Sequence, residues 1–141
     1  MAGYSGKSLT QKLGIKPGFA VAAIDPPANY RELLRPLPEG VRFCVASEKP
    51  HVIHYFCTER ERLAKELPRL RKTMREDAML WVSWPKKSSL LPTTVTEDVV
   101  REFALPLGLV DNKICAVDET WSAVRRVVRL VNRRPGAARP P

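Results

Sequence analysis

The segment LWVSWPKKS, residues 80–88, contains the pattern that best indicates how this chain folds. Side chains alternate between the two faces of a β-strand, so Trp81 and Trp84, three positions apart, are expected to face opposite sides. A large apolar side chain on each face predicts a strand that other parts of the protein cover on both sides. Pro85 has no backbone N–H to donate to a neighbouring strand, and the strand is therefore expected to end there.

Apolar runs and helical patterns alternate along the rest of the chain. Further strands are predicted at residues 19–24, 41–45, 51–57 and 113–117. Helices are predicted at residues 8–13 and 29–35, after Thr58, and after Thr94 or Thr96. This alternation predicts a single Rossmann-like α/β domain with three layers, in which a mostly parallel sheet carries helices on both sides.

Residues 121–131 fit two different structures. Their valines match a helical stripe, yet valine also favours strands. We predict a strand, because the short turn at residues 118–120 favours an antiparallel C-terminal hairpin with residues 113–117.

The helix after Thr58 combines an apolar stripe with one disruptive residue. The stripe recurs at spacings of four, three and four residues and consists of Leu63, Leu67, Leu70 and Met74. Thr58 is expected to cap the N-terminus of this helix. Pro68 lacks a backbone N–H, so it is expected to bend or interrupt the helix.

The charge is concentrated at the C-terminus. The chain has 141 residues and a formal net charge of +9, and no acid occurs after residue 124. We expect one domain over residues 1–131 and a basic, disordered tail over residues 132–141. The arginines that could bind nucleic acid or an acidic partner are Arg125, Arg126, Arg129, Arg133 and Arg134. The alternative is a solvated tail, since no aromatic side chains are interleaved with these arginines.

Cysteine usage and hydropathy indicate a cytoplasmic protein. Cys44, Cys57 and Cys115 lie among apolar residues without CxxC spacing, which is typical of reduced thiols. No apolar run approaches the length of about 18 residues that a membrane span needs. The N-terminal residues also lack the apolar region of a secretory signal.

The loops after the predicted parallel strands supply the candidate site residues. In open α/β sheets, ligands bind beyond the carboxyl ends of the strands. There the chain places a candidate ligand-binding set, Asp25, Lys86, Lys87 and Ser88. The turn after the strand at residues 113–117 supplies a candidate partner contact, Asp118, Glu119 and Trp121, and its position depends on the direction of that strand. The alternatives are structural: Asp25 capping the turn before Tyr30, lysines closing an apolar strand, and local hydrogen bonds in the hairpin turn.

No motif predicts a metal, a resident cofactor or a catalytic residue. The GYSGKS segment, residues 3–8, has two residues between its glycines where a phosphate-binding loop needs four. His51 and His54 would share a face on a helix, but on a strand they point to opposite faces. Because its spacing is wrong for a phosphate-binding loop, the GYSGKS segment instead predicts a turn that leads into the capped helix at residues 8–13.

The sequence resembles a small bacterial family known as domain of unknown function 3052. The matching segments are GYSGKSLTQKLGIKPG (residues 3–18), LWVSWPKKSS (80–89) and GLVDNKICAVDETWSAVR (108–125). This resemblance implies no particular activity, cofactor or catalytic residue.

A more distant resemblance is to the fold of class I S-adenosylmethionine methyltransferases. A helix leading into KPG, the first strand, the strand at residues 78–84 and the final strand pair are similar to that architecture. Such enzymes usually have a glycine-rich turn after the first strand, whereas no glycine occurs here between Gly18 and Gly40. Glu48 is the candidate for the acid that follows their second strand.

These observations favour a small binding or regulatory module without catalysis, which engages a protein or an anionic ligand at the strand ends. One alternative is a reduced methyltransferase-like enzyme that still binds S-adenosylmethionine. The other is a nucleic-acid-binding protein that uses the arginine-rich C-terminus.

Overall fold

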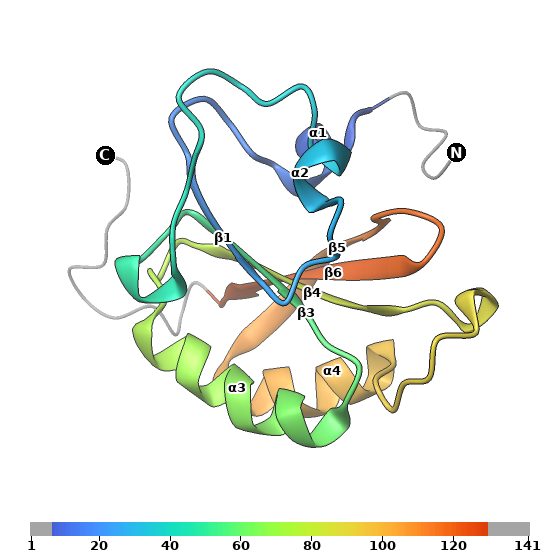
Figure 1. Cartoon of the computed structure of the whole chain (residues 1–141). Helices are drawn as coiled ribbons and strands as arrows, with labels where there is room; N and C mark the ends of the chain where they lie inside the picture. The colour runs from blue at the N-terminus through green and yellow to red at the C-terminus, as the bar shows by residue number, and fades with distance from the viewer. Residues whose placement is uncertain (1–6, 130–141) are drawn as a thin grey trace.

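The computed structural model describes residues 7–129, which form one α/β domain around a six-stranded sheet (Figure 1). The strand order is β2-β1-β3-β4-β6-β5. The strands are β1 (Ala20–Ile24), β2 (Arg42–Phe43), β3 (Val52–Phe56), β4 (Met79–Pro85), β5 (Leu109–Ala116) and β6 (Trp121–Val128). The first four run parallel, and β6 is antiparallel to both β4 and β5. The predicted fold class is confirmed, including the C-terminal hairpin.

Helices cover both faces of this sheet. They are α1 (Leu9–Leu13), α2 (Tyr30–Leu33), α3 (Arg60–Thr73) and α4 (Glu97–Ala104), with short 3₁₀ turns at Ala46–Glu48 (η1), Lys87–Ser89 (η2) and Leu105–Leu107 (η3). In Figure 1, α1 and α2 lie above the sheet, whereas α3 and α4 lie below it. No helix between residues 7 and 129 is long and apolar enough to cross a membrane.

The two tryptophans of β4 face opposite sides of the sheet, as predicted. Trp81 is fully buried and packs in the apolar cluster that contains Leu13 of α1. Trp84 packs in the other cluster, together with Leu63 of α3 and Val100 of α4. The strand is therefore the central element that both hydrophobic cores share.

Helix α3 confirms the predicted stripe, since Leu63, Leu67, Leu70 and Met74 are all buried. The helix runs from Arg60 to Thr73 without interruption at Pro68. Pro68 is exposed, so water can reach the carbonyl whose intrahelical bond the proline removes. The prediction of an interruption is wrong for this reason.

The N-terminus of α3 is capped differently from the prediction. The N-cap residue is Glu59, not Thr58. The Thr58 carbonyl accepts hydrogen bonds from the Thr93 hydroxyl and the Thr94 N–H. The Thr94 hydroxyl in turn accepts the N–H of Arg60 at 2.7 Å. A loop distant in the sequence thus satisfies the first turn of the helix, which local capping rules cannot anticipate.

The hairpin is longer than its sequence pattern suggested. Residues 121–128 form β6, which confirms a strand there, while β5 begins at Leu109 instead of residue 113. A register shift between Asp111 and Lys113 lets the polar pair at 111–112 fit into the strand. At the other edge of the sheet, the strand predicted at residues 41–45 is shortened to Arg42–Phe43.

A buried arginine in β6 leads to a stability prediction. Arg126 is fully buried, and its Nε and Nη2 atoms donate to no group among the described residues. Its Nη1 donates to the Leu109 carbonyl at 3.3 Å and lies 3.6 Å from a carboxylate oxygen of Asp111. Burial lowers the pKa of this guanidinium, because the charged form loses its hydration.

Replacing Arg126 by methionine is expected to leave the free energy of unfolding unchanged or to raise it by about 1–4 kcal/mol, because an incompletely paired buried charge is replaced by apolar packing. Urea denaturation measures the difference. The comparison variant, Asp111→Asn, keeps the buried charge but removes its anionic neighbour, so it is expected to destabilise the protein. A large loss of stability in Arg126→Met would contradict this reading of β6.

Candidate functional site

The carboxyl ends of the parallel strands meet at one edge of the sheet. Strands β1, β3 and β4 are parallel, so the loops that begin at Asp25, Cys57 and Lys86 emerge along the same edge. Strand β5 is antiparallel to β6 and therefore runs in the same direction as β4. The turn at residues 118–120 joins this edge as well.

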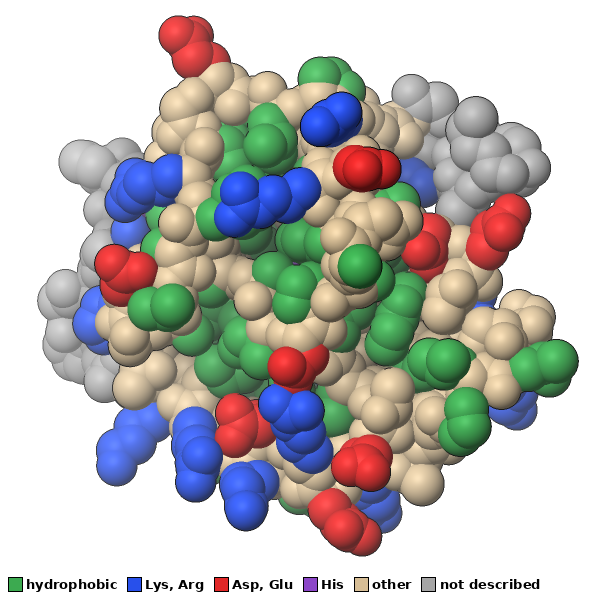
Figure 2. Space-filling view, viewed as in Figure 1, with side chains coloured by type: hydrophobic (Ala, Val, Ile, Leu, Met, Phe, Trp, Pro, Cys, Tyr) green, Lys and Arg blue, Asp and Glu red, His purple; other side chains and the backbone are tan. Residues whose placement is uncertain are grey.

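A hollow of about 590 Å³ lies at the carboxyl ends of β1 and β2, beside α2. Its lining consists of Ala23, Pro26, Pro27, Ala28, Tyr30, Arg31, Glu32, Arg35, Phe43 and Cys44. Figure 2 shows apolar side chains gathered in the middle of this face of the molecule, with basic side chains above them. The volume lies within the range of about 300–1,000 Å³ that is typical of small-molecule sites.

The loop after β1 forms one wall of the hollow without a glycine. Asp25 has a φ of 54°, a left-handed backbone conformation that glycine normally supplies. Pro26 and Pro27 follow and line the hollow, and neither can donate a backbone hydrogen bond. The loop after β1 thus has a left-handed residue at its start, but no backbone N–H at Pro26 or Pro27 that could donate to a ligand.

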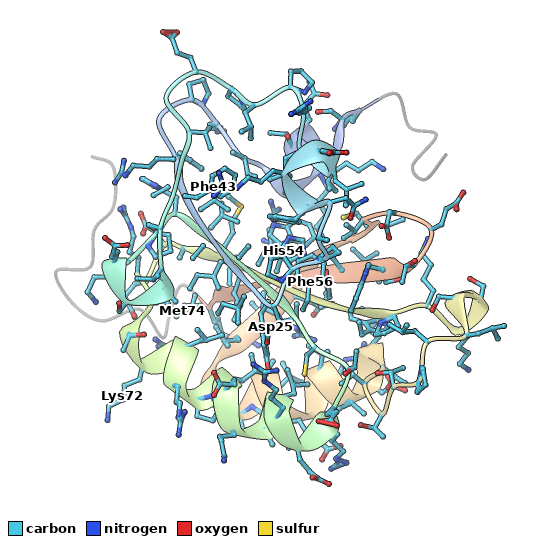
Figure 3. The ribbon with its side chains drawn as sticks, in the orientation of Figure 1. Asp25, Phe43, His54, Phe56, Lys72 and Met74 are labelled. Atoms are coloured by element: carbon cyan, nitrogen blue, oxygen red, sulfur yellow. The ribbon has the colours of Figure 1, made fainter. Side chains whose placement is uncertain are left out.

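Asp25 itself points away from the hollow. Its carboxylate pairs with Arg62 of α3, on the opposite side of the sheet from α2, and Figure 3 shows the side chain directed toward α3. The N-cap of α2 is Asn29 instead. Asp25 thus links the loop after β1 to the lower helical layer, and the interpretation of Asp25 as the cap of the turn before Tyr30 is wrong.

The wall contributed by β2 and α2 is aromatic and basic. The guanidinium of Arg31 lies 4.1 Å from the centroid of the Phe43 ring, and Figure 3 shows Phe43 on the same side of the sheet as α2. Burial raises the pKa of the neighbouring Cys44 thiol, and Glu48 raises it further, so this thiol stays protonated at neutral pH. Glu48, the candidate acid, lies in η1, accepts the N–H of Val45 just before η1, and is not part of the lining.

A buried hydrogen-bonded chain connects the hollow to the centre of the sheet. The Tyr30 hydroxyl lies 2.8 Å from Nδ1 of His54, and Nε2 of His54 lies 2.7 Å from the Ser83 hydroxyl. All three residues are buried, and burial lowers the pKa of His54 to about 3. Burial also raises the pKa of Tyr30 above its usual range, so both rings stay neutral at pH 7.

His51 has a separate structural role. Its Nδ1 accepts the N–H of Ala20 at 2.9 Å, and its ring stacks on Phe19 with centroids 4.4 Å apart. His51 and His54 therefore have different hydrogen-bond partners. Within residues 7–129, no cluster of three or more His, Cys, Asp or Glu side chains is placed to hold a metal ion.

The structure places the Lys86–Ser88 loop and the hairpin turn at residues 118–120 next to each other at this edge of the sheet. The N–H of Lys86 donates to the Thr120 carbonyl at 2.8 Å, and Pro85 pairs with Trp121 in the sheet. Lys87 and Ser88 are exposed in η2, and the hollow beside α2 includes none of these residues. Strand β3 separates β4 from β1, so Lys86–Ser88 and Asp25 emerge from strands that are not adjacent.

In the hairpin, Asp118 and Trp121 have structural roles. A carboxylate oxygen of Asp118 accepts the N–H groups of Thr120 and Trp121 at 2.9 and 2.8 Å. Trp121 is half-buried and meets the ring of Phe56 edge-on, with centroids 5.1 Å apart. Glu119 is exposed at the tip of the turn. A contact between this hairpin and a partner stays a prediction.

Of the arginines proposed for nucleic-acid binding, three lie in the described part of the chain. Arg126 is buried, Arg125 donates to the side chain of Asn112 at 2.7 Å, and Arg129 is exposed. Arg133, Arg134 and the predicted tail at residues 132–141 lie outside the described residues. Burial leaves Arg126 no access to a phosphate backbone, whereas Arg129 keeps it.

Comparisons with known proteins give structural matches only. No family model matches the chain, so the resemblance to domain of unknown function 3052 is not confirmed, and no curated protein matches it either. Among solved structures, an S-adenosylmethionine-dependent methyltransferase from Aquifex aeolicus matches with a TM-score of 0.62 at 14% identity, over 86% of this chain and 88% of that one. Fibrillarin from Aeropyrum pernix, in complex with natively bound S-adenosyl-L-methionine, matches with a TM-score of 0.54 at 11% identity, over 85% and 73%.

A third match is the ribosomal protein L11 methylase from Lactobacillus delbrueckii subsp. bulgaricus. Its TM-score is 0.52 at 11% identity, over 86% of this chain and 75% of that one. At these identities the similarity establishes the fold. The domain therefore has a Rossmann-like fold that it shares with the Aquifex aeolicus methyltransferase, and its turn after β1 contains no glycine.

Proposed function

We propose that this chain is a small methyltransferase-like protein that binds S-adenosylmethionine, or its demethylated product S-adenosylhomocysteine, in the hollow beside α2. The observation that carries the proposal is the position of the hollow at the carboxyl ends of β1 and β2, where open α/β sheets bind ligands. The shared fold of the structural neighbours supports it.

The residues of the hollow fit the nucleoside part of such a ligand. The apolar surfaces of Pro26 and Ala23 can receive a flat purine ring, beside the Phe43 ring, which the Arg31 guanidinium covers on one face. The half-buried position of Phe43 keeps the ring partly open to a ligand. When bound, the cofactor would supply an electrophilic methyl group on sulfur, and the chain's own residues would hold and orient it.

Titration calorimetry with S-adenosylmethionine and S-adenosylhomocysteine tests the proposal, with thermal unfolding as a second measurement. A ligand at 100 times its Kd stabilises the folded state by about 2.7 kcal/mol, which for a domain of this size is a rise in Tm of several degrees. Ala28→Trp, which fills the hollow from an exposed loop position, is expected to weaken binding about tenfold or more, because the new ring occupies the ligand's volume.

Ser88→Trp is the matched control, because Ser88 is also exposed on a loop at this edge but does not line the hollow. It is expected to bind both ligands as the unchanged protein does. The absence of heat and of a Tm shift with both ligands at millimolar concentration would exclude the proposal.

The second candidate is the binding module predicted around Lys86–Ser88. It is favoured by the exposure of this loop, where the side chain of Leu90 is 88% exposed next to η2 and has a left-handed φ of 61°. Loss of ligand binding in Ser88→Trp, with binding retained in Ala28→Trp, would favour this candidate over the hollow.

A further inference from the structure

Two arginines of the hollow have no carboxylate partner within the described residues. Arg31 and Arg35 both line the hollow and are both exposed. Seven other arginines of this domain each have a carboxylate oxygen within 4.0 Å, whereas Arg42, Arg125 and Arg129, which lie outside the lining, share the lack of one among the described residues. Glu32 is the only acid in the lining, and it pairs with neither arginine. The N–H donors of these two guanidinium groups are therefore open to an anionic ligand.

Arg31 is already held in position for such a ligand. Its guanidinium lies over the Phe43 ring at 4.1 Å, so the ring restricts the planar group and leaves N–H donors at its edge. A guanidinium presents these donors in a fork that matches the oxygens of a phosphate or carboxylate. Less conformational freedom is lost on binding when the side chain is already ordered.

The end of β2 also lacks an acid that would select an unmodified ribose. In Rossmann-like sheets, an acid near this point binds the ribose hydroxyls, whereas an arginine accommodates a phosphate on the ribose. Here β2 ends at Phe43 and Cys44 follows it, while one carboxylate oxygen of Glu48 accepts the N–H of Val45 at 2.9 Å. The chemistry on this wall therefore favours an anionic substituent.

We propose that Arg31 and Arg35 form an anion subsite in the hollow, which binds the phosphate of a phosphorylated adenine nucleoside or the carboxylate of an adenosyl amino acid. This inference rests on the proposed function in so far as the hollow takes a nucleoside. The subsite goes beyond the proposed function because it specifies the group that the two arginines recognise. The anion then determines which ligand binds.

Titration calorimetry at low salt, with ligands that share an adenosine, tests the subsite. The probes are adenosine, adenosine 3′-monophosphate, adenosine 5′-monophosphate and S-adenosylhomocysteine, and inorganic phosphate is used alone and as a competitor. At least one anionic probe is expected to bind about tenfold more tightly than adenosine, as charge-assisted hydrogen bonds typically provide. The advantage is expected to fall to less than about threefold at high salt, which screens the exposed charges.

The double variant Arg31→Gln/Arg35→Gln is expected to remove this advantage while adenosine binds as before. Arg35→Gln alone leaves the contact between Arg31 and Phe43 intact, so it reports on the subsite even if the double variant is unstable. Arg42→Gln is the matched control, because Arg42 is an exposed arginine of β2 outside the lining. It is expected to change nothing.

The outcomes separate the two proposals. If S-adenosylhomocysteine and adenosine bind equally well and no phosphate improves binding, the hollow is a nucleoside site and the anion subsite is excluded. An advantage that survives in both Arg→Gln variants also excludes it. If no nucleoside binds, but inorganic phosphate stabilises the unchanged protein and not the double variant, the subsite stands while the proposed function fails.

Discussion

Trp81→Ala is expected to lower the free energy of unfolding by about 3–5 kcal/mol, the range typical of a large aromatic side chain removed from a core. Trp81 is fully buried in β4, the strand that both apolar clusters share. Its Nε1–H donates to the carbonyl of Leu13 at 3.0 Å, which ties the end of α1 to the sheet. Alanine would leave a cavity and deprive that buried carbonyl of its donor.

Two comparison variants separate these effects in urea denaturation. Trp81→Phe keeps most of the packing but loses the donor, so its loss is expected to be about 1–3 kcal/mol, the range for one buried unsatisfied group. Leu90→Ala, at a side chain that is 88% exposed, is expected to stay within about 0.5 kcal/mol of the unchanged protein. Equal stabilities for Trp81→Ala and Leu90→Ala would refute the central position of Trp81.

The parts of the fold that depend on local periodicity could be predicted from the sequence. The alternation in LWVSW and the stripe in α3 report on which side chains are buried, and burial is what stabilises these elements. The cap of α3 could not be predicted, because its hydroxyl comes from Thr94, 34 residues further along the chain. The early start of β5 likewise depends on pairing with β6.

The candidate site was predicted less completely than the fold. The edge of the sheet follows from the parallel strands, but the hollow combines Pro26 and Pro27 with Arg31 and Phe43, which come from three separate segments. Arg31 reads in the sequence as an ordinary exposed helix residue, and only its contact with Phe43 distinguishes it. A signal for the buried chain in the sequence is Ser83, a polar residue between the two tryptophans of an apolar strand, but nothing in the sequence pairs it with His54, 29 residues away.

The buried chain of Tyr30, His54 and Ser83 gives the second large expected effect, a loss of stability in acid. His54 has a pKa of about 3 when folded and about 6.5 as a free side chain. Below pH 6.5 the His54 side chain of the unfolded chain is therefore protonated, whereas in the folded chain it stays neutral until the pH is near 3. This contribution to stability is complete above pH 6.5 and is lost as the pH falls, at up to about 1.4 kcal/mol per pH unit.

His54→Gln is expected to be less stable than the unchanged protein at pH 7, because the glutamine side chain cannot reproduce both hydrogen bonds. Its stability should fall less steeply between pH 6.5 and 4, because the group that titrates in the unfolded chain is gone. The measurement is urea denaturation at several pH values, read as the difference between variant and unchanged protein, so that acid effects on the salt bridges cancel.

His51→Gln is the control. Burial and Arg75 also lower the pKa of His51, but its surroundings are less enclosed. Its replacement should therefore change the slope of stability against pH by a smaller amount. Parallel pH profiles for the unchanged protein and His54→Gln would show that His54 accepts a proton as readily in the folded chain as in the unfolded one, and would contradict this prediction.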